Sequence, residues 1–404
     1  MKDITPGPCY PLGFRAAGIR CGIRPTQTKP DLALLVSDTP ASAAAVYTTN
    51  LVKGAPLLVT QEHLQNGTAQ AVICNSGNAN TCNADGIEIA EAMCALVETH
   101  LGIPAGDVLV ASTGVIGQPL PIAPIAAGMP ALCENLSCDG SEQAARAIMT
   151  TDTFPKLAAA QFQVNGVPCR IGGMAKGSGM IHPNMATLLA FLTTDAAIEP
   201  GLLAKTLKES AEGTLNMLSI DGDTSTNDMC CVLANGLAGN DEINGPGEAL
   251  EAFKRALTQV LTGLTRMLAR DGEGATKLLE CRITGARTER DARLAAKGVI
   301  SSSLVKAAMF GADANWGRVL CALGYSGADI DVALVSVSFE SSAGRVDVCE
   351  NGAGIPFSEE QAALVLGEEE ITMLVGLHDG EAAATAWGCD LTYNYVKING
   401  DYRT

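Results

Sequence analysis

Residues 185–196, MATLLAFLTTDA, constrain the fold more than any other part of this sequence. The stretch is apolar at consecutive positions rather than at alternate ones, which is typical of a strand covered on both faces. A buried strand needs packed layers on each side. The chain has 404 residues, more than a single core usually supports, so we expect two structural units or one large layered unit.

Further strands and helices are expected along both halves of the chain. The other expected strands are residues 32–38, 71–77, 108–114, 333–340, 344–350 and 391–399. The expected helices are residues 86–100, 246–271 and 301–310, with another beginning at residue 141. Aromatic residues make up only 4% of the chain, so the core must consist of Ala, Val, Leu and Ile. Strands and helices do not alternate strictly, which predicts the α+β class.

Charge and cysteine usage exclude several classes of protein. The net charge of −17 repels phosphate groups, so neither nucleic acid nor an anionic membrane is an expected partner. The fourteen cysteines form no C-x-x-C pair and the four histidines do not cluster beside them, so no metal site is expected. The uncharged residues 108–133 are interrupted by four prolines and do not form a membrane span. Reduced cysteines and a start that does not resemble a signal peptide favour the cytoplasm.

The glycine-rich segment before the buried strand does not fit a nucleotide site. In GGMAKGSGM, residues 172–180, Lys176 precedes Gly177, whereas a P-loop places its lysine after the last glycine. The G-x-G-x-x-G pattern also fails, because His182 stands where the third glycine is required.

Thr187 allows a different interpretation of the same segment. A threonine hydroxyl needs a nearby base to act as a nucleophile, and its own α-amine supplies one if the bond after Ala186 is cut. Such an amine titrates near ~8, so much of it is unprotonated at neutral pH. The alternative is that Thr187 is simply one β-branched residue of a strand, and the local spacing alone favours that alternative.

Several long segments, in order, resemble one enzyme family. They are ASTGVIGQPLP (111–121), TTDTFPK (150–156), KGSGMIHPNMATLLAF (176–191), SIDGDTSTNDM (219–229), RDGEGATK (270–277), SSSLVKAAMFGADANWGR (301–318) and YVKINGDYRT (395–404). Together they are similar to the ornithine acetyltransferase/glutamate N-acetyltransferase family, which recycles acetyl groups in arginine biosynthesis. The resemblance spans almost the whole chain and favours the nucleophile interpretation of Thr187.

The resemblance implies a fold, a maturation step and an activity. The fold would be a layered α/β/β/α-type sandwich with an accessory domain. Self-cleavage between Ala186 and Thr187 would give an alpha chain, 1–186, and a beta chain, 187–404, that share one fold and assemble as a heterotetramer of two copies of each. Thr187 would take the acetyl group of N2-acetylornithine and pass it to glutamate. No bound cofactor is implied, and acetyl-CoA stays open as a co-substrate.

The resemblance also assigns roles to individual residues. Thr113 and Gly114 would form the oxyanion hole. The substrate contacts would be Thr153, Lys176, Thr187, Glu273, Asn399 and Thr404. A lysine suits an α-carboxylate and a glutamate suits the terminal ammonium of ornithine, although both residue types are more often solvated surface charges.

Two alternative functions and one unassigned motif remain. A self-cleaving amidase or aminopeptidase of related fold would use the same nucleophile with water as the acceptor, and a non-catalytic binding protein would keep Thr187 in its core. The segment SIDGDTSTND lacks the glutamate that an EF-hand calcium loop requires at its twelfth position. We interpret it as scaffolding near the site, without an assigned role.

Overall fold

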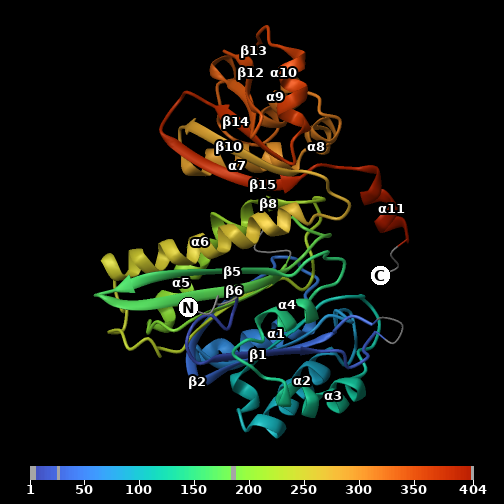
Figure 1. The fold of residues 1–404 in the computed structure, drawn as a ribbon, viewed down its shortest axis with the longest axis vertical. Helices are drawn as coiled ribbons and strands as arrows, with labels where there is room; N and C mark the ends of the chain where they lie inside the picture. The colour runs from blue at the N-terminus through green and yellow to red at the C-terminus, as the bar shows by residue number, and fades with distance from the viewer. Residues whose placement is uncertain (1–5, 25–27, 183–187, 402–404) are drawn as a thin grey trace.

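The computed structural model describes residues 6–24, 28–182 and 188–401. Figure 1 shows two mixed sheets stacked along the long axis of the molecule, with the long helix α6 (Glu248–Arg270) running between them. The first sheet comes from the N-terminal part of the chain and the second mainly from the residues after α6.

The first sheet has eight strands, in the order β4-β3-β2-β9-β7-β6-β5, with β1 paired to β2. Its strands are β1 (Phe14–Ile19), β2 (Leu32–Tyr47), β3 (Thr68–Asn75), β4 (Val108–Ser112), β5 (Lys156–Val164), β6 (Val167–Lys176), β7 (Leu189–Thr194) and β9 (Met229–Ala234). The long β2 joins two halves of the sheet, because its first part pairs with β1 and β3 and its last part pairs with β9.

The two halves of this sheet pack face to face. Their inner faces share one core, to which Leu35 and Leu109 contribute from one half and Phe191 and Cys231 from the other. Helices bury the two outer faces: α2 (Gly86–Leu101) and α3 (Ile122–Glu134) on one side, α5 (Pro200–Glu212) and α6 on the other. The expected α/β/β/α sandwich is therefore present, with β7 buried on both faces as its sequence predicts.

The second sheet forms the accessory unit. Its seven strands run in the order β13-β12-β11-β14-β10-β15-β8. They are β8 (Leu218–Ser219), β10 (Leu278–Ala286), β11 (Ser336–Ser341), β12 (Gly344–Glu350), β13 (Ala353–Gly354), β14 (Glu370–Gly376) and β15 (Ala382–Cys389). The helices of this unit are α7 (Glu289–Ser301), α8 (Ser303–Phe310), α9 (Trp316–Gly324) and α10 (Glu359–Gly367). One hydrophobic core runs continuously from the outer face of the sandwich through α6 into this sheet.

The periodicity after Pro246 predicts α6 correctly. Its apolar stripe, which includes Phe253, Leu257, Leu261, Leu264 and Leu268, is buried between the two units. The shorter helices α1 (Ala55–His63) and α4 (Ser141–Ala147) complete the sandwich. Within the described ranges, none of the helices is both long and apolar enough to cross a membrane.

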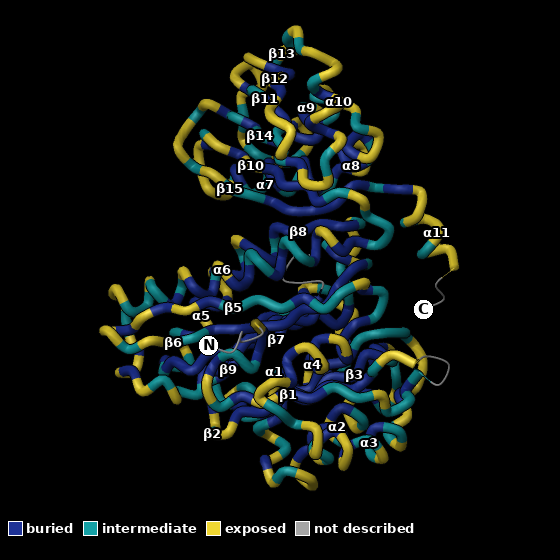
Figure 2. The backbone as a smooth tube through the Cα atoms, viewed as in Figure 1, coloured by how far each residue is buried: buried dark blue, intermediate teal, exposed yellow. Residues whose placement is uncertain are grey.

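The strand expected over residues 391–399 is wrong. From Tyr393 onward that segment belongs to the helix α11 (Tyr393–Asp401), and no residue of this helix is buried (Figure 2). The alternation of aromatic and β-branched residues suggested a strand, but the segment joins no described sheet edge whose pairing would stabilise one. Instead, the Thr392 hydroxyl accepts a hydrogen bond from the Asn394 N–H at 3.1 Å, as a capping residue does at the start of a helix.

Candidate active site

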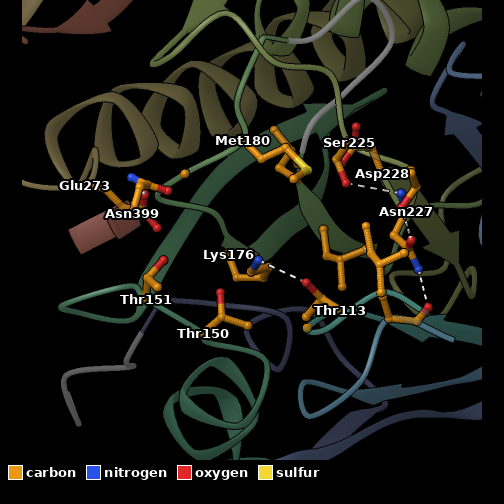
Figure 3. Close-up of a pocket in the computed structure, with 17 residues that line it drawn as sticks. Thr113, Thr150, Thr151, Lys176, Met180, Ser225, Asn227, Asp228, Glu273 and Asn399 are labelled. Atoms are coloured by element: carbon orange, nitrogen blue, oxygen red, sulfur yellow. Dashed lines mark hydrogen bonds between the residues drawn. The ribbon is translucent and has the colours of Figure 1, made fainter. Parts of the chain in front are cut away.

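One pocket brings together five of the residues that the sequence singles out: Thr113, Gly114, Lys176, Glu273 and Asn399 (Figure 3). They come from four separate places in the chain. Thr113 and Gly114 follow β4, Lys176 ends β6, Glu273 follows α6 and Asn399 lies on α11. The fold thus joins the sandwich and the C-terminal helix at one cavity.

The turn after β4 lines the pocket and contains two hydrogen-bond donors, the Thr113 hydroxyl and the Gly114 N–H. Lys176 Nζ donates to Thr113 Oγ1 at 3.2 Å, which leaves the hydroxyl proton of Thr113 able to donate elsewhere (Figure 3). Gly114 has a φ of +131°, and a Cβ there would lie 2.8 Å from the Asn78 nitrogen, so only glycine fits. Among the described residues no group accepts a hydrogen bond from the Gly114 N–H. A hydroxyl and an N–H side by side are the donors that an oxyanion hole needs.

Buried asparagines hold this turn in place. Asn75 Nδ2 donates to Ser112 Oγ at 2.6 Å, and the side-chain oxygen Asn75 Oδ1 accepts from the Asn78 N–H at 3.0 Å. Asn227, from the segment SIDGDTSTND, donates to the Ala79 carbonyl at 2.5 Å and to the Ser112 carbonyl at 3.0 Å. Neither residue was identified from the sequence. The signal for Asn75 is the density of asparagines at the end of β3, a pattern that favours side-chain to backbone hydrogen bonds, and the signal for Asn227 is its place in SIDGDTSTND, which we interpret as scaffolding.

A buried network of ion pairs lies beside the backbone of Lys176. The Lys156 ammonium lies 2.6 Å from Asp152 Oδ1 and 2.5 Å from Asp271 Oδ2, and all three side chains are buried. Asp152 also accepts from the Gly177 N–H at 2.7 Å. Burial alone would raise the pKa of Asp152, but the ammoniums of Lys156 and Lys176 lower it to about 2. The network therefore fixes the backbone next to Lys176 and places one negative charge close to its ammonium.

We expect Asp152→Asn to destabilise the protein in a pH-dependent way. A carboxyl whose pKa is lowered on folding stabilises the folded state above its ordinary pKa, and that contribution is lost as the pH falls towards the folded value. The shift from 3.8 to about 2 corresponds to about 2 kcal/mol. In denaturant titrations, the deficit of the variant should therefore shrink by about 2 kcal/mol between about pH 5 and pH 2.

Asp38→Asn is the matched control for this measurement, because Asp38 pairs with Arg15 at the surface and each side chain is nearly half exposed. Its effect should stay below about 1 kcal/mol. A deficit of Asp152→Asn that is constant over this pH range would contradict the assignment of a lowered pKa.

A carboxylate and an amide form another wall of the pocket. Asn399 Nδ2 donates to Glu273 Oε2 at 2.7 Å, and Figure 3 shows the two side chains together, apart from Thr113. Glu273 approaches the backbone of Gly179 so closely that a Cβ there would lie 2.3 Å from its carboxylate. Gly179 is therefore required for Glu273 to take this position.

Thr153 lies apart from the pocket. Its N–H donates to Asp271 Oδ2 at 3.0 Å and its hydroxyl also donates to that carboxylate. It lines a neighbouring groove with residues of α11, whereas Thr150 and Thr151 line the pocket itself. The substrate contact assigned to Thr153 stays a prediction.

Three other predicted residues, Ala186, Thr187 and Thr404, lie outside the described residues. Leu188, which follows Thr187 in the chain, lines the pocket, and its carbonyl accepts from the Met229 N–H at 3.0 Å. Among the described residues, no three His, Cys, Asp or Glu side chains converge on a point where they could hold a metal ion.

Comparison with known proteins identifies the family. The ArgJ family matches residues 15–404 of the sequence. The chain belongs to the ArgJ family. This confirms the family predicted from the sequence, and the chain is an acetyltransferase of arginine biosynthesis. The alternatives, an amidase or a binding protein, are not favoured.

Individual ArgJ proteins are similar over the whole length. The arginine biosynthesis bifunctional protein ArgJ of Symbiobacterium thermophilum is 53% identical over 407 residues, covering 100% of both chains. The protein of the same name from Caldanaerobacter subterraneus is 51% identical, covering 98% of each. A crystal structure of ArgJ from Bacillus halodurans is 42% identical, covers 52% of this chain and 98% of that chain, and has a TM-score of 0.49.

Proposed function

We propose that this ArgJ-family enzyme transfers the acetyl group of N2-acetylornithine to glutamate through an acetyl-Thr187 intermediate. The Thr187 hydroxyl attacks the acetyl carbonyl and its proton passes to the departing α-amine, so ornithine leaves. The amine of glutamate then attacks the acetyl-threonine ester, which gives N-acetylglutamate and restores the hydroxyl.

The observation that carries this proposal is that one pocket contains both hydrogen-bond donors suited to an oxyanion and charged groups suited to an amino-acid substrate. Each step passes through a tetrahedral intermediate with a negative oxygen, and Thr113 with Gly114 supplies two donors for it. Leu188, the residue after the proposed nucleophile, lines the same pocket.

The charges in the pocket suit an amino acid with a cationic side chain. The Lys176 ammonium complements the α-carboxylate, and the Glu273 carboxylate complements the terminal ammonium of ornithine. Asn399 adds an amide next to Glu273. Thr153 and Thr404 remain further proposed contacts, one lying in the neighbouring groove and the other beyond the described residues.

Maturation is part of the proposal. Cleavage between Ala186 and Thr187 would free the α-amine of Thr187, which would act as the base for its own hydroxyl. The chains 1–186 and 187–404 would stay joined, because β7 pairs along its whole length with the second part of β6, with Lys176 opposite Leu189. The proposed assembly is a cytoplasmic heterotetramer of two copies of each chain, and acetyl-CoA is a proposed second donor.

A transfer assay with labelled acetylornithine tests this function. With glutamate present, label should appear in N-acetylglutamate, and ornithine should be released at the same rate. Without glutamate, ornithine release should stop after about one ornithine per active site, because the acetyl-enzyme has no acceptor. Steady release of free acetate in both reactions would identify a hydrolase instead and would contradict the proposal.

A further inference from the structure

The segment SIDGDTSTND contains a carboxylate that contacts two functional parts of the molecule. Asp221 Oδ2 accepts from the Met180 N–H at 2.6 Å, and Asp221 Oδ1 accepts from the Ile181 N–H at 2.8 Å. On its other side, Asp221 accepts a hydrogen bond from the Tyr395 hydroxyl of α11 at 3.3 Å. One side chain therefore links the end of KGSGMIH, residues 176–182, to the C-terminal helix.

The contact with Met180 constrains a strained backbone. Met180 has a φ of +56°, which is uncommon for a residue other than glycine. The neighbouring bonds run between the same two segments: the Ile220 N–H donates to the Ile181 carbonyl at 2.7 Å, and Thr224 Oγ1 donates to the His182 carbonyl at 2.9 Å. The chain is thus held up to His182, five residues before Thr187.

The contact with Tyr395 matters because α11 has little else to hold it. No residue of α11 is buried, and Tyr393 and Val396 are 85% and 69% exposed. Among the described residues, the other polar side-chain contact from α11 to the rest of the chain is that of Asn399 with Glu273, and the Tyr393 ring packs edge-on against Phe310. Burial and the nearby Asp221 carboxylate raise the pKa of Tyr395, so its hydroxyl stays protonated and donates.

We propose that Asp221 is a positioning residue that holds both the segment leading to the cleavage point and the helix that brings Asn399 into the pocket. The inference rests on the proposed self-cleavage for its first part, whereas its second part concerns only substrate binding. A carboxylate is required because both of its oxygens accept from adjacent backbone N–H groups. In Asp221→Asn an amide NH2 would replace one acceptor and would face an N–H donor.

Three variants separate these two roles: Asp221→Asn, Tyr395→Phe and the control Asp223→Asn. Asp223 is an exposed carboxylate two residues away in the same loop. For each variant, the fraction of cleaved chain is followed over time by denaturing electrophoresis, and KM and kcat are measured on the cleaved protein. Thermal unfolding of each variant checks the folded state.

Asp221→Asn should slow cleavage and raise KM for acetylornithine, each by about tenfold, the effect of losing about one charged hydrogen bond. Tyr395→Phe should cleave at the normal rate and raise KM by a similar factor with kcat unchanged, because it loses only the link to α11. Asp223→Asn should match the wild type in every measurement.

Normal cleavage and normal KM in Asp221→Asn would overturn the inference. If Asp221→Asn does not fold, an unchanged KM in Tyr395→Phe would overturn the link to α11. Failure of the proposed function would look different, because the wild type itself would then remain one chain or transfer no acetyl group.

Discussion

Replacing Thr187 with alanine is expected to leave the protein as one 404-residue chain without acetyltransferase activity. Two effects combine in this variant. Without the hydroxyl, the bond after Ala186 is not attacked, and without the nucleophile, no acetyl-enzyme forms. Loss of the catalytic nucleophile alone lowers kcat by roughly 10⁶-fold in a serine protease. Intact-mass measurement and the transfer assay report the two effects separately.

Thr187→Ser is the matched control, because serine keeps the hydroxyl and loses only a methyl group. We expect this variant to be cleaved and to retain measurable transfer. Recovery of Thr187→Ala as two chains cut before residue 187 would contradict the self-cleavage mechanism. Normal transfer by an uncut Thr187→Ala protein would contradict the assignment of the nucleophile.

Replacing Thr113 with alanine is expected to lower kcat by about 10²–10³-fold, the usual cost of removing one oxyanion donor. Lys176 Nζ lies 3.2 Å from Thr113 Oγ1, so the substitution also removes a partner of the Lys176 ammonium. If the same donors serve the cleavage reaction, maturation should slow as well, since both reactions develop charge on a carbonyl oxygen.

Thr113→Ser separates the hydroxyl from the rest of the side chain. It keeps the Oγ and should stay within about tenfold of the wild type, whereas Thr113→Ala should not. The assay is single-turnover transfer by mature enzyme, which excludes any effect of slow cleavage. A mature Thr113→Ala enzyme within about twofold of the wild type would remove Thr113 from the oxyanion hole.

The layered α/β/β/α sandwich was expected only from the resemblance to a family, whereas individual buried elements could be predicted from local sequence because burial leaves a pattern of apolar residues. The doubly buried β7 and the apolar stripe of α6 are examples, and both form where their patterns indicate. The strand expected over residues 391–399 is wrong because few packing contacts select one conformation there. The sequence pattern therefore reflects β-propensity alone.

The pocket could be predicted only in part. Thr113, Lys176, Glu273 and Asn399 were assigned through resemblance to a family, since their separation along the chain hides their proximity. Residues that position them, such as Asn227, act through contacts with segments more than a hundred residues away. The spacing of motifs along a sequence does not predict such contacts, and only the folded structure shows them.

The central claim is that an acetyl group passes through the Thr187 hydroxyl. The most direct test is to mix the enzyme with acetylornithine in the absence of glutamate, quench with acid, and map the acetylated peptide by mass spectrometry. We predict one added acetyl group per active site, on the peptide that begins at Thr187, and its loss when glutamate is added before the quench. An unmodified Thr187 in enzyme that nevertheless transfers acetyl to glutamate would contradict the account.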